Sequence, residues 1–358
     1  MNEARRICGK ICTGLMLACV IAVGWSCSKP PETASSNSSA PAKRKIRIGM
    51  VAKSEVNDVF QAAKTGAFDA AKELSDKYGA DISIEWRTPS SEDANKQVEA
   101  IRALANEKVD GITVSCSDAA TLTPAIDEAV DKGVPVVCFD SDAPDSKRLC
   151  DYGTEDGPCG QIIMRELARV MGEKGTVAIL AGNEAAPNLR LRVTAAREEL
   201  AKHPNMSELG GTNGVFHHEE TPEKAVEAVD RAMAANQGKI DGWAMIGGWP
   251  LFTDHALKWE PGTVKCVSCD ALPKQLEYLR NGQVQVLVSQ DCYGWGHRTV
   301  EILIDKIING KNPEQTKIPN PLTIVTKAAP DPSLPVEANM PRMQLDQFAG
   351  YWDKWLKK

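Results

Sequence analysis

Residues 109–140 read VDGITVSCSDAATLTPAIDEAVDKGVPVVCFD, and their pattern of apolar residues indicates the fold class. Its apolar runs at 111–115 and 134–139 are typical of short buried strands, and a helix is expected between them. Strand, helix and strand in this order form a βαβ unit, in which the two strands are parallel. Asp140 follows the second strand directly.

The same alternation of strand and helix extends through most of the chain. Further strands are expected at residues 46–51, 81–86, 176–180, 214–216, 240–246, 263–268 and 284–289. So many parallel strands are unusual for one sheet, and a chain of 358 residues exceeds what one core usually supports. We therefore expect an α/β protein with two Rossmann-like lobes, each a parallel sheet with helices on both faces.

The charge composition of the chain argues against two classes of binding partner. The chain carries a formal net charge of −6 with 25% charged residues, and its body contains no basic cluster. Nucleic acids and anionic membrane surfaces attract basic patches, so neither is an expected partner.

The N-terminus has the features of an export signal. Arg5 and Arg6 precede an apolar run at 15–23, which is too short to span a membrane. Gly24-Trp25-Ser26-Cys27 then resembles a lipoprotein cleavage site, although Trp25 is bulkier than usual. We expect residues 1–27 to be a lipoprotein-type signal peptide with Cys27 acylated; ordinary signal cleavage near the same point is the alternative.

A polar spacer follows the signal. Residues 28–42 read SKPPETASSNSSAPA and contain almost nothing to bury. We expect residues 28–44 to be a disordered tether. The protein is thus expected in the periplasm or at the cell surface, in contact with the membrane only through the lipid on Cys27.

Cysteines in the body of the chain are expected to be mostly buried thiols, with Cys150 and Cys159 the best candidates for a disulfide. Cys266 and Cys269 resemble half a zinc site, but no second such pair exists. The run His217-His218-Glu219-Glu220 reads as a loop whose adjacent side chains diverge. Neither a metal nor a cofactor is expected.

Polar residues follow several of the expected strands in both halves. Asn57, Asp140, Asp270 and Gln290 all take such positions. Ligands of open α/β sheets bind beyond the carboxyl ends of the strands, so these residues are candidate ligand contacts. A turn or a helix cap would also explain any one of them.

This set of side chains suits a polyol. Carboxylates and amides pair with adjacent hydroxyls, and a buried guanidinium adds several donors, for which Arg190 and Arg192 are candidates. Phe60, Trp249 and Trp295 lie near expected strand ends and offer flat faces to a sugar ring; a core role is the alternative for each.

Several short segments occur in a fixed order along the chain. They are residues 109–115 (VDGITVS), 133–143 (GVPVVCFDSDA), 153–156 (GTED), Arg192 in the helix after 178–180 (AIL), 267–270 (VSCD) and 288–290 (VSQ). Together they resemble the ribose-type periplasmic sugar-binding proteins of ABC importers, over residues 45–322. The resemblance implies the type I periplasmic binding protein fold, with three hinge crossings between the lobes and the ligand in the cleft.

The resemblance also implies boundaries and contacts. Lobe one is expected at 45–151 plus 291–319, lobe two at 152–290 plus 320–327, and a C-terminal extension with a terminal helix at 328–358. The sugar contacts it implies are Asn57, Phe60, Asp140, Arg192, Asp270 and Gln290.

Departures from the ribose type change the expected ligand. Lys53, Val59 and Ser141 stand where that type has a small hydroxyl residue, an aromatic and an arginine. Glycine at 247 and 248 replaces an asparagine, and Trp249 is a candidate stacking face instead. We therefore expect Lys53 and Trp249 in the pocket and a pentose, methyl pentose or hexose other than ribose as ligand.

The expected function is capture of a small sugar by a monomer and its delivery to an ABC permease in the inner membrane, without catalysis. A sensor that reports the sugar to a membrane receptor is the first alternative. A carbohydrate-active enzyme using Asp140 and Asp270 as an acid–base pair is the second, and the chain has no P-loop, G-x-S-x-G or H-E-x-x-H motif.

Overall fold

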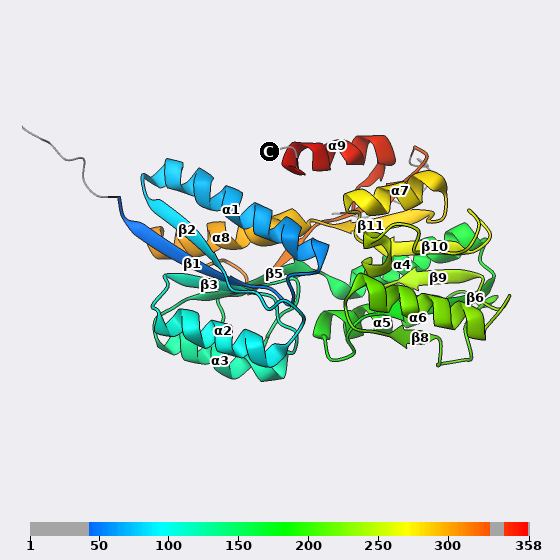
Figure 1. Cartoon of the computed structure of the whole chain (residues 1–358), viewed down its shortest axis with the longest axis horizontal. Helices are drawn as coiled ribbons and strands as arrows, with labels where there is room; N and C mark the ends of the chain where they lie inside the picture. The colour runs from blue at the N-terminus through cyan, green and yellow to red at the C-terminus, as the bar shows by residue number, and fades with distance from the viewer. Residues whose placement is uncertain (1–42, 330–339, 357–358) are drawn as a thin grey trace, which may run out of the picture. The chain divides into compact units, whose positions relative to one another are not determined.

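Two sheets organise the chain (Figure 1). The structure, a computed structural model, describes residues 43–329 and 340–356, with side chains up to residue 350. The expected signal peptide, Cys27 and nearly all of the expected tether lie outside these residues. Within them, no helix is long and apolar enough to cross a membrane.

The first sheet has six strands in the order β12-β5-β4-β3-β1-β2, all parallel. They are β1 (Lys45–Val51), β2 (Asp81–Trp86), β3 (Gly111–Val114), β4 (Val136–Phe139), β5 (Cys150–Thr154) and β12 (Lys317–Asn320). The βαβ unit predicted from residues 109–140 is β3, α3 (Ala119–Asp131) and β4. Asp118 caps α3, and every residue of β3 and β4 is buried.

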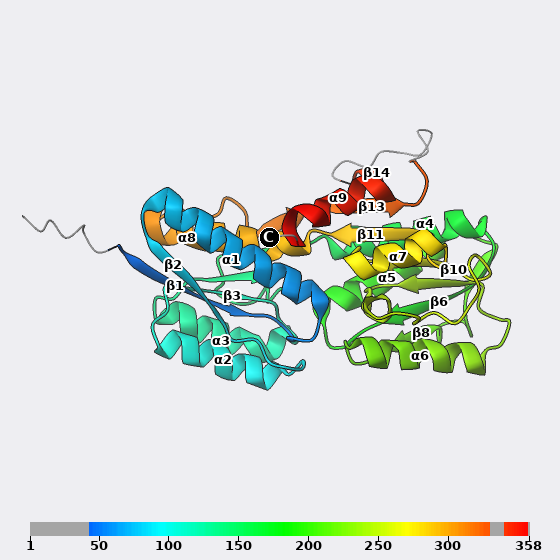
Figure 2. The same cartoon turned by 45° about the horizontal axis from the view of Figure 1, so that its top comes forward.

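Helices cover both faces of this sheet. On one face α1 (Asp58–Tyr78) packs against α8 (Cys292–Asn309), and on the other α2 (Ala94–Asn106) packs against α3 (Figure 2). The α1–α8 contact is close because both helices have glycine there. A Cβ at Gly296 would collide with the backbone of Ala63.

The second sheet has the order β14-β13-β11-β10-β9-β6-β7, with β8 also paired to β6. Its strands are β6 (Gly175–Ala181), β7 (Met206–Glu208), β8 (Val215–His217), β9 (Gly242–Met245), β10 (Lys265–Cys269), β11 (Val286–Gln290), β13 (Leu322–Thr326) and β14 (Arg342–Gln344). The helices of this lobe are α4 (Asp156–Met171), α5 (Pro187–Leu200), α6 (Pro222–Ala235), the short η1 (Trp249–Phe252), α7 (Pro273–Asn281) and α9 (Leu345–Leu356). The predicted class, two lobes of sheets flanked by helices, is confirmed.

The chain passes between the two sheets after Thr154, after Gln290 and after Asn320. One boundary differs from the expected position, because all of β5 up to Thr154 pairs within the first sheet, whereas residue 152 was expected to begin the second lobe. Two strands, β13 and β14, also depart from the expected parallel sheet, because both run against its other strands. A single residue separates β12 from β13, so the chain continues into the second lobe in the same direction and β13 pairs antiparallel with β11.

The C-terminal extension contributes to the second lobe. β14 adds a parallel strand beside β13, and α9 packs against α7, as Figure 2 shows. Leu345 and Phe348 on α9 are buried. Arg342 on β14 forms an ion pair with Glu166 of α4, at 2.5 Å, which ties the extension to the helix layer.

Cysteines of the described residues are buried free thiols. The expected Cys150–Cys159 disulfide is therefore wrong. Cys150 lies on β5 in the first sheet, whereas the Cys159 sulfur on α4 lies 3.9 Å from the Cys269 sulfur on β10.

Asp151 on β5 has a buried carboxyl group whose protonation affects the stability of the fold. Its side chain is buried, and within residues 43–329 and 340–356 its Oδ1 has no hydrogen-bond partner. Burial raises the pKa of this carboxyl to about 8, and the nearby charge of Asp142 adds to the shift. Because the folded protein holds a proton that the unfolded chain releases near pH 4, this group destabilises the fold increasingly as pH rises from about 4 to 8.

Asp151→Asn is expected to raise the melting temperature at pH 8 and to give a smaller gain at pH 5. Circular dichroism melts at both pH values measure the difference between variant and wild type. Asp145→Asn, at an exposed position on the preceding loop, is the control. An equal gain at both pH values, or a loss at pH 8, would contradict the argument.

Candidate functional site

The expected cleft is a small cavity where the carboxyl ends of the two sheets meet. Its volume is about 20 Å³, which holds about one water molecule. Its lining residues are Lys53, Asn57, Val59, Phe60, Asp140, Asn188, Leu189, Arg192, Glu220, Gly247, Trp249, Asp270, Gln290 and Trp295. A ligand the size of a sugar therefore enters only when the lobes move apart.

Two carboxylates occupy matching places in the lobes. Asp140 directly follows β4, and Asp270 directly follows β10. Both have left-handed backbone conformations, with φ of 58° and 66°. Residues other than glycine seldom adopt this conformation, and where they do it commonly marks a functional site. Each turn aims a buried carboxylate into the cavity.

Hydrogen bonds hold both carboxylates in place. Asp140 accepts from the Ser115 hydroxyl at 2.7 Å and from the Asn188 amide at 3.3 Å. Asp270 accepts from Gln290 Nε2 at 2.7 Å and from the Gly248 backbone at 3.2 Å. Burial raises the pKa of Asp270, and these donors oppose that shift.

Arg192 on α5 is the centre of a buried network in the second lobe. Its Nε donates to Asp156 at 2.8 Å, and its Nη2 donates to Gln290 Oε1 at 2.6 Å. Gln290 Nε2 in turn donates to Asp270, and Gln290 Oε1 also accepts from the Thr154 hydroxyl at 2.8 Å. Gly160 on α4 allows α5 to approach, because a Cβ there would collide with the Arg192 carbonyl. The guanidinium is thus positioned before any ligand binds.

Lys53 and Asn188 connect the lobes. Lys53, just after β1, donates to Asn188 Oδ1 at 3.4 Å, and its ammonium lies 3.6 Å from Asp140. It also lies 3.9 Å from Glu220, which belongs to the second lobe. Lys53 is 2% exposed and Glu220 is 6% exposed. Charged groups of both lobes therefore meet in a region that water hardly reaches.

Aromatic rings supply the apolar surface. Phe60 on α1 packs against Trp295 and Phe139, with ring centroids 6.3 Å apart in both pairs. On the other lobe, the Trp249 ring covers Gly247 and Gly182 so closely that neither could carry a Cβ. Asn57 lies beside Phe60, and its Oδ1 caps α1 at Val59, so it has a structural role as well.

One predicted residue, Arg190, lies outside the cavity lining. Arg190 is exposed, and its guanidinium donates to the backbone carbonyls of Glu184 and Ala185, outside the cavity. It lies two residues before Arg192 on α5, so the two side chains point in different directions. The other predicted residues all line the cavity: Lys53, Asn57, Phe60, Asp140, Arg192, Trp249, Asp270 and Gln290.

Sequence reasoning missed Asn188 and Glu220. Asn188 lies four residues before Arg192, so helical spacing could have found it. Glu220 follows the weak strand β8 in a polar run that offers no periodic signal. Trp295, considered only as an aromatic near a strand end, lines the cavity with its Nε1 without a hydrogen-bond partner among the described residues.

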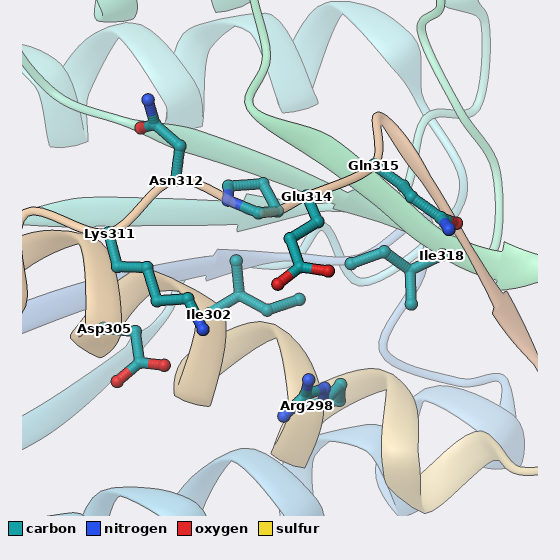
Figure 3. A pocket seen from close by; sticks show the side chains of 9 residues that line it. Arg298, Ile302, Asp305, Lys311, Asn312, Glu314, Gln315 and Ile318 are labelled. Atoms are coloured by element: carbon teal, nitrogen blue, oxygen red, sulfur yellow. The ribbon is translucent and has the colours of Figure 1, made fainter.

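A larger hollow of about 330 Å³ lies between α8 and residues 311–318 (Figure 3). It lies within one lobe, and most of its lining residues are exposed, including Arg298, Lys311 and Glu314. Its position away from the strand ends and its exposed lining make it a weaker candidate. The described residues also include no group of three or more His, Cys, Asp or Glu side chains placed to hold a metal.

The chain is similar in sequence to known sugar-binding proteins. The ribose import binding protein RbsB of Bacillus subtilis is 26% identical over 167 residues, which is 47% of this chain and 52% of that protein. The chain thus spans about half the length of this curated relative. The D-ribose/D-allose-binding protein of Pseudomonas aeruginosa is 22% identical over 80% of this chain and 91% of its own length.

Among solved structures, a solute-binding protein of an ABC transporter from Burkholderia graminis, in complex with D-arabinose, matches with a TM-score of 0.71. It is 23% identical and covers 80% of this chain and 96% of its own, a likeness that shows the shared fold. A family model described as a periplasmic binding protein domain matches residues 48–312. With that match over most of its length, the chain belongs to the periplasmic binding protein family.

Proposed function

We propose that this protein is an extracytoplasmic solute-binding protein that captures a sugar between its lobes and delivers it to an ABC-type permease. One observation carries the proposal. Carboxylates, amides and cations from both lobes converge with aromatic rings on one buried cavity. Hydroxyl groups need paired donors and acceptors, and the CH face of a sugar ring packs on aromatic faces. Three relatives and neighbours are named for ribose, allose or arabinose.

Binding by lobe closure requires no catalyst. A ligand that contacts both lobes binds the closed state more tightly than the open one and so shifts the population toward closure. Asp140 and Asn57 act from lobe one, and Arg192 and Asp270 from lobe two. Asp140 and Asp270 each accept hydrogen bonds from neighbouring residues, which fixes their oxygens in positions to contact a ligand.

The proposal places the protein outside the cytoplasm, exported by residues 1–27 and anchored by a lipid on Cys27. It is supported by the family and by the apolar run and polar spacer of the sequence. We propose a monomer whose lobes are 45–154 plus 291–320 and 155–290 plus 321–327. A receptor in place of a permease is the alternative, and co-purification from membranes distinguishes the two partners.

A thermal-shift screen tests the sugar assignment. The purified protein is heated with pentoses, hexoses, deoxy sugars and polyols, one at a time. A ligand at a hundred times its dissociation constant adds about 2.7 kcal/mol, so at least one sugar is expected to raise the melting temperature clearly. The sugar should be recovered unchanged. Consumption of the sugar would support the enzyme, and a well-folded sample without any response would refute sugar binding.

A further inference from the structure

Lys53 and Glu220 form an unusual pair across the cleft. Lys53 Nζ and Glu220 Oε1 lie 3.9 Å apart, which is an ion-pair distance but too long for a hydrogen bond. Burial raises the pKa of the Glu220 carboxyl to about 8, although the Lys53 ammonium opposes that shift. Lys53 belongs to the first lobe and Glu220 to the second. Both side chains line the cavity, and both are nearly completely buried.

Neither group uses its full hydrogen-bonding capacity. Glu220 Oε1 has no hydrogen-bond partner within the part of the chain that the structure describes. The Lys53 ammonium has three protons, and its hydrogen bond to Asn188 is long at 3.4 Å. A buried carboxylate oxygen without a donor is costly, so a partner is expected to come from the ligand.

A hydroxyl group fits between these two groups. It can accept a hydrogen bond from the ammonium and donate one to the carboxylate at the same time. The cavity lining combines two cations, Lys53 and Arg192, with three carboxyl groups, Glu220, Asp140 and Asp270. A ligand charge of either sign would therefore meet like charges in a site screened from water. An uncharged polyhydroxy ligand avoids both repulsions.

Lys53 is held in its charged form. Burial lowers the pKa of its ammonium, but Glu220, Asp140 and Glu92 outweigh that effect, and the pKa is raised overall. Glu220 also lines an outer groove of about 520 Å³ that includes Ser54 and Glu92 of the first lobe. Glu220 therefore stands between this groove and the inner cavity, and Lys53 faces it from the cavity side.

We propose that Lys53 and Glu220 are a specificity-determining pair that binds one hydroxyl of an uncharged sugar from both lobes at once. This inference rests on the proposed sugar-binding function. It adds that the ligand is uncharged and that Lys53 and Glu220 select for it. The hydroxyl replaces the direct Lys53–Glu220 contact, so the pair contributes to affinity only when the lobes are closed on the ligand.

Calorimetric titration with deoxy sugars tests the pair. The probes are D-ribose, D-xylose, D-glucose and D-galactose with their monodeoxy analogues, and the proteins are wild type, Lys53→Met, Glu220→Gln and the control Glu219→Gln. For a sugar that binds, removing one particular hydroxyl is expected to weaken binding to wild type about tenfold. The same removal should cost less in Lys53→Met and Glu220→Gln than in wild type, because each variant removes one of the two charged partners of that hydroxyl.

Both substitutions keep the approximate length of the side chain, and Glu219 is an exposed neighbour whose variant should behave as wild type. Deoxy penalties that stay the same in both variants would overturn the pair while leaving sugar binding intact. Tighter binding of D-glucuronate than D-glucose, or of D-galacturonate than D-galactose, would also overturn it. No binding of any probe to the wild type, together with no response in the thermal-shift screen, would overturn the sugar-binding function and the pair together.

Discussion

Replacing Arg192 with alanine is expected to abolish measurable sugar binding and to lower the free energy of unfolding by about 3–5 kcal/mol. The guanidinium is 2% exposed and donates to Asp156, Gln290 and the Ile246 carbonyl. Its removal leaves the Asp156 carboxylate buried without its partner. Urea denaturation measures the loss of stability, and calorimetry measures the loss of binding.

Two variants make this result interpretable. Arg190→Ala, two residues earlier on α5, removes an exposed guanidinium that bonds only to local carbonyls, so its stability and sugar affinity should match wild type. Arg192→Lys keeps the charge beside Asp156 but cannot reach several acceptors at once, so it should recover stability better than affinity. Equal loss of binding in Arg190→Ala and Arg192→Ala would contradict the placement of the cavity.

The second large effect is expected for Asp140→Asn, with a loss of sugar affinity of about 10- to 100-fold. Asparagine has the same shape and also tolerates the left-handed backbone of this position. What it loses is the charge that faces Lys53 at 3.6 Å and the second acceptor oxygen. Titration of wild type and variant with the sugar found by screening measures the effect.

Asp145→Asn on the following loop is the matched control, because Asp145 is exposed and outside the cavity lining. A melting temperature near that of wild type would show that Asp140→Asn is folded. Unchanged affinity in a folded Asp140→Asn would remove Asp140 from the list of ligand contacts while leaving the fold untouched.

The part of the site that lies at strand ends could be predicted from the sequence. Asp140, Asp270 and Gln290 each follow or end a buried apolar run, and parallel sheets bring such ends together at one edge. To find residues at the carboxyl ends of strands, only the strand boundaries are needed, and apolar runs mark these boundaries well. The same runs predicted the class of both lobes.

Residues on helices and loops were harder to assign. Arg190 and Arg192 are equally plausible when only the residue type is considered, and the choice depends on which face of α5 turns inward. Asn188 and Arg192 share that face at a spacing of four, and Arg190 does not. Glu220 has no such periodic partner, because its position depends on how an irregular loop packs against the other lobe.

Among the described strands, the antiparallel pairing of β13 with β11 has a local cause that the pattern within one strand does not reveal. The direction of β13 follows from the single residue between β12 and β13, which carries the chain straight from one sheet into the other. The pattern of apolar residues in a strand does not show which way the strand runs. Only the order in which the chain crosses between the two sheets could have predicted the direction of β13.

The short strand β14 has a consequence for how the protein behaves at high concentration. Without it, β13 would be the last strand on its side of the second sheet and would offer a row of free backbone donors and acceptors to other chains. β14 occupies that row and is itself only three residues long, with α9 following at once. The C-terminal extension thereby protects the protein against edge-to-edge aggregation, a benefit separate from ligand capture.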